Sequence, residues 1–380
     1  FWGVFQMLGN WALLADLSSP DHFFYEFERP HEFLFWRLTG INLLPLLLGV
    51  LFFIQQKYMT PPTATLTPEQ ESQQKIMRGM MIVAFGFKVG AAPFHLAIPD
   101  AYSGTSSMVA GVLATASKAM GFVALMRLLL TIAMPATGSA FWYGALAVIS
   151  VVTMTWGNLA ALSSDNPKRV FAYSSVAHAG YMLAAIAAVG SGLADTESEE
   201  LIVTAVLFHL CVLVVFKMGP FLVLSSLDRE GRSHIMTGLH GLSSRDPLLA
   251  GSMFVFMLSL AGVPPFSGFL SKLLMINGIV SVSAGSGGAS SILSWATSVE
   301  PVFWLAVAIV LNSALSVFYY LGIGMVMFFE DNEGDSGSPS NPALRGLILA
   351  LAILSVALGA GPLSECLLGY AENAAQALLL

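Results

Sequence analysis

The strongest constraint in this sequence is a succession of apolar stretches of membrane-spanning length, separated by short polar segments. A helix needs about 20 apolar residues to cross the ~30 Å hydrocarbon core of a bilayer. Inside that core a helix satisfies its own backbone hydrogen bonds. The pattern predicts an all-α, polytopic transmembrane helix bundle with about ten segments. We expect them at residues 1–16, 41–56, 80–98, 107–133, 140–163, 169–191, 201–226, 247–284, 301–329 and 345–371.

Composition supports this class. Charged residues make up 10% of the 380 residues and hydrophobic residues 56%, whereas a soluble globular domain has about 25% charged residues. These values exclude an ordinary soluble enzyme and a disordered chain. The net charge of −7 argues against a nucleic-acid partner. Because the chain begins with Phe1 and shows no signal peptide, we expect a fragment or a processed piece.

Two of the expected helices contain an interruption. Pro93 lies within 80–98, and Pro264-Pro265 lies within 247–284. A broken helix at membrane depth persists only where protein or a water-filled cavity satisfies its free backbone groups, and transporters place sites at such breaks. A lysine lies close to each break, Lys88 to the first and Lys272 to the second. The alternative is that these prolines only kink their helices.

Four lysines fall inside apolar stretches: Lys88, Lys118, Lys217 and Lys272. A lysine at a helix centre costs about 2.5–3.5 kcal/mol, so intramembrane lysines are functional candidates by default. Desolvated lysines release protons more readily, which suits a proton relay. Lys217 follows His209 and precedes Gly219-Pro220, where we expect a break. The alternative for all four lysines is snorkelling to the headgroups.

Two histidines are further relay candidates. His178 has Ser174 and Ser175 one turn away. His95 follows Lys88 by seven residues and shares its helical face if that helix is continuous. The alternatives are that His178 is a core histidine whose hydrogen bonds are satisfied, and that His95 lies at the membrane–water interface.

The motifs of several enzyme classes are missing from the sequence. It has no phosphate loop, no HExxH, no GxSxG and no dinucleotide fingerprint. Cys211 and Cys366 have no paired spacing, which excludes a disulfide framework and a CxxC metal site. With no histidine pair for haem and no cysteine set for an iron–sulfur cluster, we expect no redox cofactor in this chain.

Three segments resemble one family in matching order: FKVGAAPFHLAIPDAYSGTSSMVAGVLATASKAMGFVALMRLL (87–129), NPKRVFAYSSVAHAGYML (166–183) and LSLAGVPPFSGFLSK (258–272). The family is subunit N of bacterial respiratory NADH–quinone oxidoreductase (complex I). Its members are antiporter-like and translocate protons. The resemblance covers about 84–371 and omits the family's first six helices, one of which carries a glutamate partner for the lysine at the Lys88 position.

The resemblance implies an antiporter-like fold with discontinuous helices over 83–380. It implies that Lys88 is the pumping lysine, Lys118 the connecting lysine and Lys272 the lysine of the second broken helix. Lys217 departs from the pattern, since a small or amide residue is expected there. The implied role is a non-redox, proton-translocating subunit coupled to quinone reduction elsewhere in the complex.

The resemblance also implies the surroundings of the chain. Its expected partners are other membrane-arm subunits of complex I, the lipid bilayer and protons. NADH, FMN, iron–sulfur clusters and quinone are expected in partner subunits, and no cofactor or metal in this chain. The expected location is the bacterial inner membrane.

Residues 1–82 resemble a different family, the YidC-type membrane insertases. The resemblance rests on FWGVFQMLGNWALLADLSSPD (1–21) and INLLPLLLGVLFFIQQKYMTPPTATLTPEQESQQKIMRGMM (41–81). Basic loops after alternate helices also place the two parts in opposite orientations under the positive-inside rule. We therefore hypothesise a chimera, with an insertase-like helical segment at 1–82 joined to the antiporter-like domain at 83–380. A re-entrant first or second helix would instead remove the conflict.

Two other functions stay open at this point. One is a stand-alone or Mrp-type cation/proton antiporter subunit, which would share the fold without an electron-transfer partner. The other is a membrane-protein insertase fragment, which rests on residues 1–82 alone.

Overall fold

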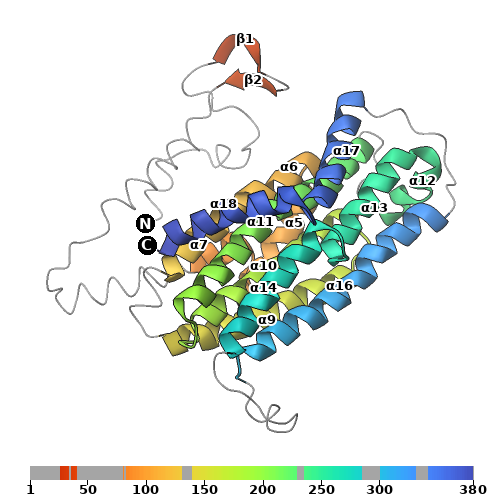
Figure 1. Ribbon diagram of the computed structural model, residues 1–380. Coiled ribbons are helices and arrows are strands. Elements are labelled where there is room, and N and C mark those ends of the chain that lie inside the picture. The colour runs from red at the N-terminus through yellow and green to blue at the C-terminus, as the bar shows by residue number, and fades with distance from the viewer. Residues whose placement is uncertain are drawn as a thin grey trace, which may run out of the picture. The chain divides into compact units, whose positions relative to one another are not determined.

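The computed structural model describes residues 26–33, 36–40, 80, 83–130, 139–228, 235–284, 300–330 and 341–379. The chain divides into two compact units, Phe1–Gln73 and Gln74–Leu380 (Figure 1). The expected helices at 1–16 and 41–56 lie outside the described residues. The insertase-like segment at 1–82 and the boundary after it therefore stay predictions.

The described part of the first unit is a β-hairpin. Strands β1 (Glu26–Phe33) and β2 (Trp36–Gly40) pair antiparallel, with Phe33 opposite Trp36 and Glu32 opposite Arg37. The register shifts between Glu26 and His31, a stretch that contains Pro30. Proline has no N–H to donate to a ladder and is therefore found at such irregularities.

Helices are the only regular secondary structure among the described residues of the second unit. The longer ones are α5 (Ala97–Gly104), α6 (Ser107–Val112), α7 (Lys118–Leu128), α9 (Ser139–Leu162), α10 (Pro167–Val189), α11 (Thr196–Asp228), α13 (Pro247–Ala261), α14 (Ser267–Ala284), α16 (Phe303–Phe329), α17 (Pro342–Ala357) and α18 (Pro362–Leu379). Shorter turns are η1 (Phe94–Leu96), the π-helical η2 (Leu113–Ser117), η4 (Met236–Leu239) and α12 (Leu242–Arg245). The all-α prediction is confirmed for this unit.

Three of these helices begin with the same sequence device. Asn166, Asp246 and Asn341 cap α10, α13 and α17, and each is followed by a proline at the first helical position. The capping side chain accepts a hydrogen bond from a backbone N–H that has no partner inside the helix. Proline costs nothing at the first position because its missing N–H would be unpaired there. Short local signals therefore fix where these helices start.

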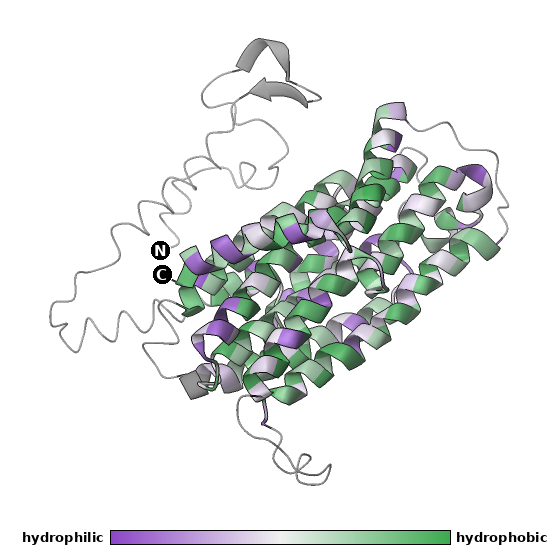
Figure 2. Ribbon diagram, viewed as in Figure 1, coloured by the Kyte–Doolittle hydropathy of each residue, from purple (hydrophilic) through white to green (hydrophobic). Residues whose placement is uncertain are grey.

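Five helical runs among the described residues are long and apolar enough to cross a membrane. They are Ser107–Leu128, Trp142–Leu162, Pro167–Val189, Thr196–Asp228 and Phe303–Phe329. They confirm the expected spans at 107–133, 140–163, 169–191, 201–226 and 301–329. Figure 2 shows hydrophobic residues along these helices, whereas hydrophilic residues gather at short connecting elements such as α12. The chain is an integral membrane protein.

Both expected interruptions are present. Residues 83–89 are helical, but Gly90 takes a left-handed φ of 80° and ends that helix before η1. Gly262, with a φ of 82°, ends α13, and α14 resumes at Ser267. Glycine is the residue that adopts this backbone conformation at little cost.

Two other expectations are wrong. Residues 345–371 are not one helix, because α17 and α18 meet at 80°. The bend packs against the α13–α14 break, where a Cβ on Gly359 would lie 1.9 Å from the carbonyl oxygen of Pro265. No break follows Lys217 either, because α11 continues through Pro220. Nearly every residue of α11 around Pro220 is buried against surrounding helices. A proline inside a membrane helix is tolerated in such a setting.

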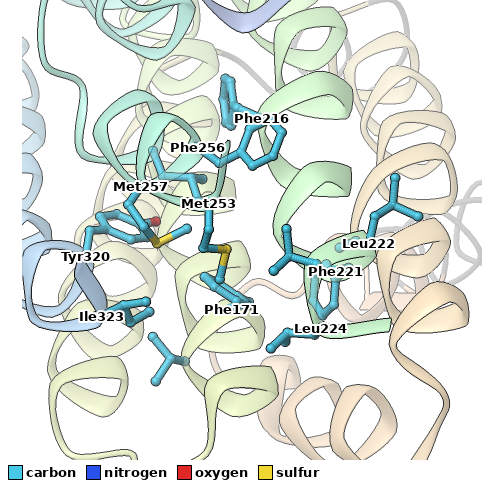
Figure 3. Packing of buried hydrophobic residues seen from close by; sticks show 14 of the residues in the cluster. Phe171, Phe216, Phe221, Leu222, Leu224, Met253, Phe256, Met257, Tyr320 and Ile323 are labelled. Atoms are coloured by element: carbon cyan, nitrogen blue, oxygen red, sulfur yellow. The ribbon is translucent and has the colours of Figure 1, made fainter. Parts of the chain in front are cut away.

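The core lies around α10. In the most apolar part of this helix, 94% of the residues are buried. Figure 3 shows Phe171 of α10 among large side chains of α11, α13 and α16. On its other side α10 approaches α9 with backbones almost in contact. A Cβ on Gly180 would lie 2.5 Å from the backbone nitrogen of Met154, and one on Gly157 would lie 2.7 Å from that of Ala177. Small residues at helix crossings permit such close packing in membranes.

We predict that Gly180→Ala destabilises the bundle, because the added methyl group forces α9 and α10 apart. Overpacking of this kind costs about 1–3 kcal/mol. The measurement is the thermal unfolding of the purified full chain in detergent. Gly144→Ala is the matched control on α9, since a Cβ there meets nothing within 4 Å. Equal melting temperatures for the two variants would contradict the prediction.

Candidate functional site

Three lysines and two histidines meet inside the bundle. Lys118, Lys217 and Lys272 are exposed by 2%, 0% and 4%, and His178 and His209 by 1% and 0%. They come from four helices: α7, α11, α14 and α10. We call these five residues the buried basic line.

Lys118 is held by the backbone of α10. It is the first residue of α7, directly after the π-helical turn η2. Its Nζ donates a hydrogen bond to the carbonyl oxygen of Ser175. Single π-helical turns inside helices are frequent at functional sites, and here the turn immediately precedes the buried amine.

Lys217 approaches α10 at the neighbouring serine. Its Nζ donates to Ser174 Oγ at 2.5 Å, and the Ser174 hydroxyl is also hydrogen-bonded to Tyr320. Ser174 and Ser175 are consecutive, so α10 binds two lysines through adjacent residues. Lys217 donates to a side-chain oxygen, and Lys118 donates to a main-chain oxygen.

The two histidines form an ordered hydrogen-bonded pair. His178 Nδ1 lies 3.1 Å from His209 Nε2, and His209 Nδ1 lies 2.8 Å from Ser271 Oγ. When Ser271 donates its proton to the carbonyl oxygen of Gly268, 3.1 Å away, its oxygen accepts from His209. A neutral imidazole has one donor and one acceptor nitrogen. His209 Nε2 is then the acceptor, and His178 donates from Nδ1.

The break between α13 and α14 binds Lys272. Its Nζ donates to the carbonyl oxygens of Leu260 and Ala261 at 2.9 and 3.0 Å and to Ser313 Oγ at 2.8 Å. Those two carbonyls lie in the last turn of α13, where a helix has no internal partners for them and where its dipole favours a cation. Lys272 also lies 5.5 Å from the centre of the Tyr181 ring, within the range of a cation–π contact. The interruption therefore supplies the oxygens that the lysine needs.

Lys88 and His95 lie outside the buried basic line. Lys88 is exposed, although its side chain passes the α7 backbone, since a Cβ on Gly121 would lie 2.8 Å from Lys88 Cγ. His95 is 4% exposed and packs edge-on against Trp156 with 5.9 Å between ring centres. Neither ring nitrogen of His95 has a hydrogen-bond partner within the described ranges. The helix ends at Gly90, so the helical face that we expected these two residues to share does not form.

A second polar cluster joins α9, α10 and α16. Asn158 Nδ2 donates to the hydroxyl of Tyr181 at 3.1 Å, and its Oδ1 accepts from the hydroxyl of Tyr319 at 3.0 Å. The ring centres of Tyr319 and Tyr320 are 4.3 Å apart. Through the Tyr320–Ser174 hydrogen bond this cluster reaches Lys217.

The ion pairs among the described residues join helix ends. Lys168 Nζ lies 3.2 Å from Asp228 Oδ1 and also donates to the carbonyl oxygen of Thr105 at 3.1 Å. Ser107 donates to the same carboxylate through its backbone and its hydroxyl. The other ion pairs are Arg169–Asp100 and Arg345–Asp246. His240 Nε2 lies 2.9 Å from Glu330 Oε2. Within the described ranges, then, no carboxylate neutralises a lysine of the buried basic line.

Two members of this site, His209 and Ser271, are not among the functional residues expected from the sequence. His209 was noted only as a neighbour of Lys217, and Ser271 was not noted. A signal existed for each. His209 and Lys217 are eight residues apart on one helix, close to one face, and Ser271 directly precedes Lys272. No group of three or more His, Cys, Asp or Glu side chains in the described part of the chain could hold a metal ion.

We predict that Asp228→Ala strongly destabilises the bundle, because Lys168 is 1% exposed and would be left without its carboxylate. Removing one partner of a buried ion pair costs about 3–5 kcal/mol, and the 23% exposure of Asp228 places the effect at the low end. Thermal unfolding of the full chain in detergent measures it. Asp100→Ala is the control, since that carboxylate is 72% exposed and surface pairs contribute about 0–1 kcal/mol.

A family match covers all five residues of the buried basic line. Residues 33–299 match the family described as NADH:quinone oxidoreductase/Mrp antiporter, TM. The match begins inside residues 1–82, and these comparisons give no support to an insertase resemblance there. Over 287 residues the chain is 38% identical to NADH-quinone oxidoreductase subunit N of Heliobacterium modesticaldum, covering 75% of this chain and 55% of the relative. It is 39% identical to the subunit N of Rubrobacter xylanophilus, of which it covers 56%.

Solved structures give the same picture. A chain of respiratory complex I from Thermus thermophilus aligns with a TM-score of 0.59 at 30% identity, covering 83% of this chain and 62% of that one. A chain of the Mrp complex from Dietzia sp. aligns with a TM-score of 0.66 at 22% identity, which shows a common fold only. The chain spans just over half the length of the curated relatives it matches, at 55% and 56%.

Proposed function

This chain belongs to the NADH:quinone oxidoreductase/Mrp antiporter transmembrane family, and from that premise we propose that it conducts protons within a respiratory NADH–quinone oxidoreductase. It would act as a non-redox subunit of the membrane arm in a bacterial inner membrane. NADH, FMN, iron–sulfur clusters and quinone would be bound by partner subunits. The names of the curated relatives support this proposal. Since the chain matches only part of their length, the activity of the whole protein is itself proposed.

The observation that carries the proposal is the buried basic line. Lys118 and Lys217 contact adjacent serines of α10, and the pair of His178 and His209 continues to Ser271, the residue before Lys272. Like charges in a low-dielectric interior repel strongly. A proton added to one lysine therefore raises the free energy of a proton on the next. This coupling drives protons along the line when a charge changes at one end.

The hydrogen bonds suggest how a proton passes the histidines. A proton arriving at His178 Nε2 allows His178 to release the proton on Nδ1 to His209 Nε2. His209 then releases its Nδ1 proton toward Ser271, and each imidazole is left as the opposite tautomer. This transfer needs no cofactor, because imidazole binds a proton on one nitrogen and releases it from the other. Ser271 would pass its own proton on by turning it away from Gly268. The amine of Lys272, the next residue, would then take up that proton and carry it toward the membrane surface.

Cation/proton antiport is the second candidate, because the family description names Mrp antiporters. The chemistry of the line favours protons over metal cations. Amines and imidazoles exchange protons, whereas hard cations prefer carboxylate and carbonyl oxygens. In the part of the chain that the structure describes, no carboxylate reaches the line.

We predict that Lys118→Ala abolishes proton pumping. The substitution removes the amine next to Ser175 and interrupts the line, so NADH-driven proton uptake should fall at least about a hundredfold, the loss of one positioned proton-transfer group. The measurement uses membrane vesicles that contain the assembled complex. NADH oxidation by an artificial acceptor should stay unchanged because this chain holds no redox step.

The matched control is Ser117→Ala, at the preceding, half-buried residue. It should pump like the wild type. Unchanged pumping in the Lys118 variant would disprove the role of the line. Sodium-dependent transport without NADH would favour antiport instead.

A further inference from the structure

The ring of Tyr181 contacts two members of the buried basic line. Lys272 Nζ lies over this ring, 5.5 Å from its centre. The imidazole of His178, one turn earlier on α10, packs against the same ring at an angle of 74°, with 5.5 Å between ring centres. Tyr181 is 1% exposed, so both contacts lie inside the bundle. One aromatic side chain therefore lies beside both the histidine pair and the lysine of the second break.

The hydroxyl group of Tyr181 is engaged on another helix. It accepts a hydrogen bond from Asn158 Nδ2 at 3.1 Å. The same nitrogen lies 3.0 Å from the backbone carbonyl oxygen of Asn312. A carbonyl oxygen only accepts hydrogen bonds, so the amide nitrogen and not its oxygen occupies this position. Because the hydroxyl is held at α9, Tyr181 acts on Lys272 through its ring.

The hydrogen bonds of Lys272 are those of a protonated amine. An ammonium has three N–H groups, and Lys272 Nζ donates to three oxygens, the carbonyls of Leu260 and Ala261 and the hydroxyl of Ser313. A neutral amine has two N–H groups and would leave one of these oxygens without its donor. The face of an aromatic ring attracts a cation through its quadrupole, an attraction that a neutral amine lacks. All four contacts thus favour the form that carries the proton.

Neighbouring cations oppose this proton. His178 on α10, and His209 and Lys217 on α11, interact electrostatically with Lys272, and each is a cation when protonated. The contacts that α13 and α16 make with the amine come from neutral oxygens. Like charges repel strongly in a low-dielectric interior. Each contact that stabilises the ammonium, the ring included, therefore changes how readily Lys272 accepts a proton from the line.

We propose that Tyr181 is a positioning residue for proton transfer at Lys272, because its ring face stabilises the protonated amine at the second break. A ring face cannot take up a proton. It favours the charged form without becoming a competing acceptor, as a carboxylate in that place would be. Without the ring, Lys272 should lose its proton at lower pH. This inference rests on the proposed proton-conducting function.

The test is the pH profile of NADH-driven proton pumping in vesicles that contain the assembled complex. Pumping requires Lys272 to take up a proton, so it falls at alkaline pH, where this lysine stays neutral. Tyr181→Leu removes the ring, and the alkaline limb of the profile should move to lower pH by about one unit, the scale of a desolvated cation–π contact. Tyr181→Phe keeps the ring and loses only the hydroxyl, so its profile should match the wild type.

Phe171→Leu is the matched control. Phe171 also lies on α10, is fully buried and packs against the ring of Phe221 with 5.6 Å between ring centres. The control removes an aromatic ring from the same helix, so a general loosening of the bundle affects both leucine variants. Its pumping rate can fall, but the alkaline limb should stay at the wild-type pH.

A fluorinated phenylalanine at position 181 keeps the test decisive if Tyr181→Leu does not assemble. Fluorine atoms withdraw electron density from the ring face and weaken its attraction for a cation, whereas the shape of the ring is almost unchanged. The alkaline limb should then lie at lower pH than in Tyr181→Phe.

The result separates the two proposals. An unchanged profile in Tyr181→Leu or with the fluorinated ring overturns the role of the Tyr181 ring, and so does an equal shift in Phe171→Leu or in Tyr181→Phe. Loss of pumping in Lys118→Ala would still support proton conduction. Unchanged pumping in Lys118→Ala would instead remove the function on which this inference rests.

Discussion

The structure depends on the hydrogen bonds that offset the free-energy cost of burying its lysines. Each lysine of the line contacts neutral oxygens: the Ser175 carbonyl for Lys118, the Ser174 hydroxyl for Lys217, and two carbonyls with a hydroxyl for Lys272. A carboxylate partner would hold the proton more firmly. Neutral acceptors lower the cost of burial and still let the amine give the proton up. Helix breaks, the π-helical turn and the buried serines all serve this need.

Helix α10 is the element that makes these contacts possible. It is buried on all sides, so side chains around its whole circumference meet protein. Ser174 and Ser175 contact two lysines, His178 contacts His209, and Tyr181 contacts Asn158. The close approach at Gly180 holds α9 near enough for Asn158 to join the network. A helix with a single polar face could not connect so many partners.

Much of this arrangement could be predicted from single residues. A lysine in an apolar stretch marked Lys118, Lys217 and Lys272. Prolines marked the two breaks, at Pro93 and at Pro264-Pro265, although the same reasoning wrongly predicted a break at Gly219-Pro220. The exposure of Lys88 and the lack of a hydrogen bond at His95 could not be predicted, since both depend on where Gly90 turns the chain. The Asn158 cluster was missed because its members are about 20 to 160 residues apart and none is charged. The bend between α17 and α18 does have a local signal, because Gly361, with a φ of 107°, directly precedes Pro362, the first residue of α18.

That bend has a mechanical consequence. Gly359 lies against the backbone at Pro265, and Ser355 Oγ lies 3.4 Å from Ser267 Oγ. The start of α14 therefore packs against the end of α17 and against the joint that leads into α18. At its far end α18 is tied to α11, where Gln376 donates to Glu200 at 2.7 Å. A movement of α14, which carries Lys272, would therefore press on this joint, and the helix that follows the joint is hydrogen-bonded to the beginning of α11.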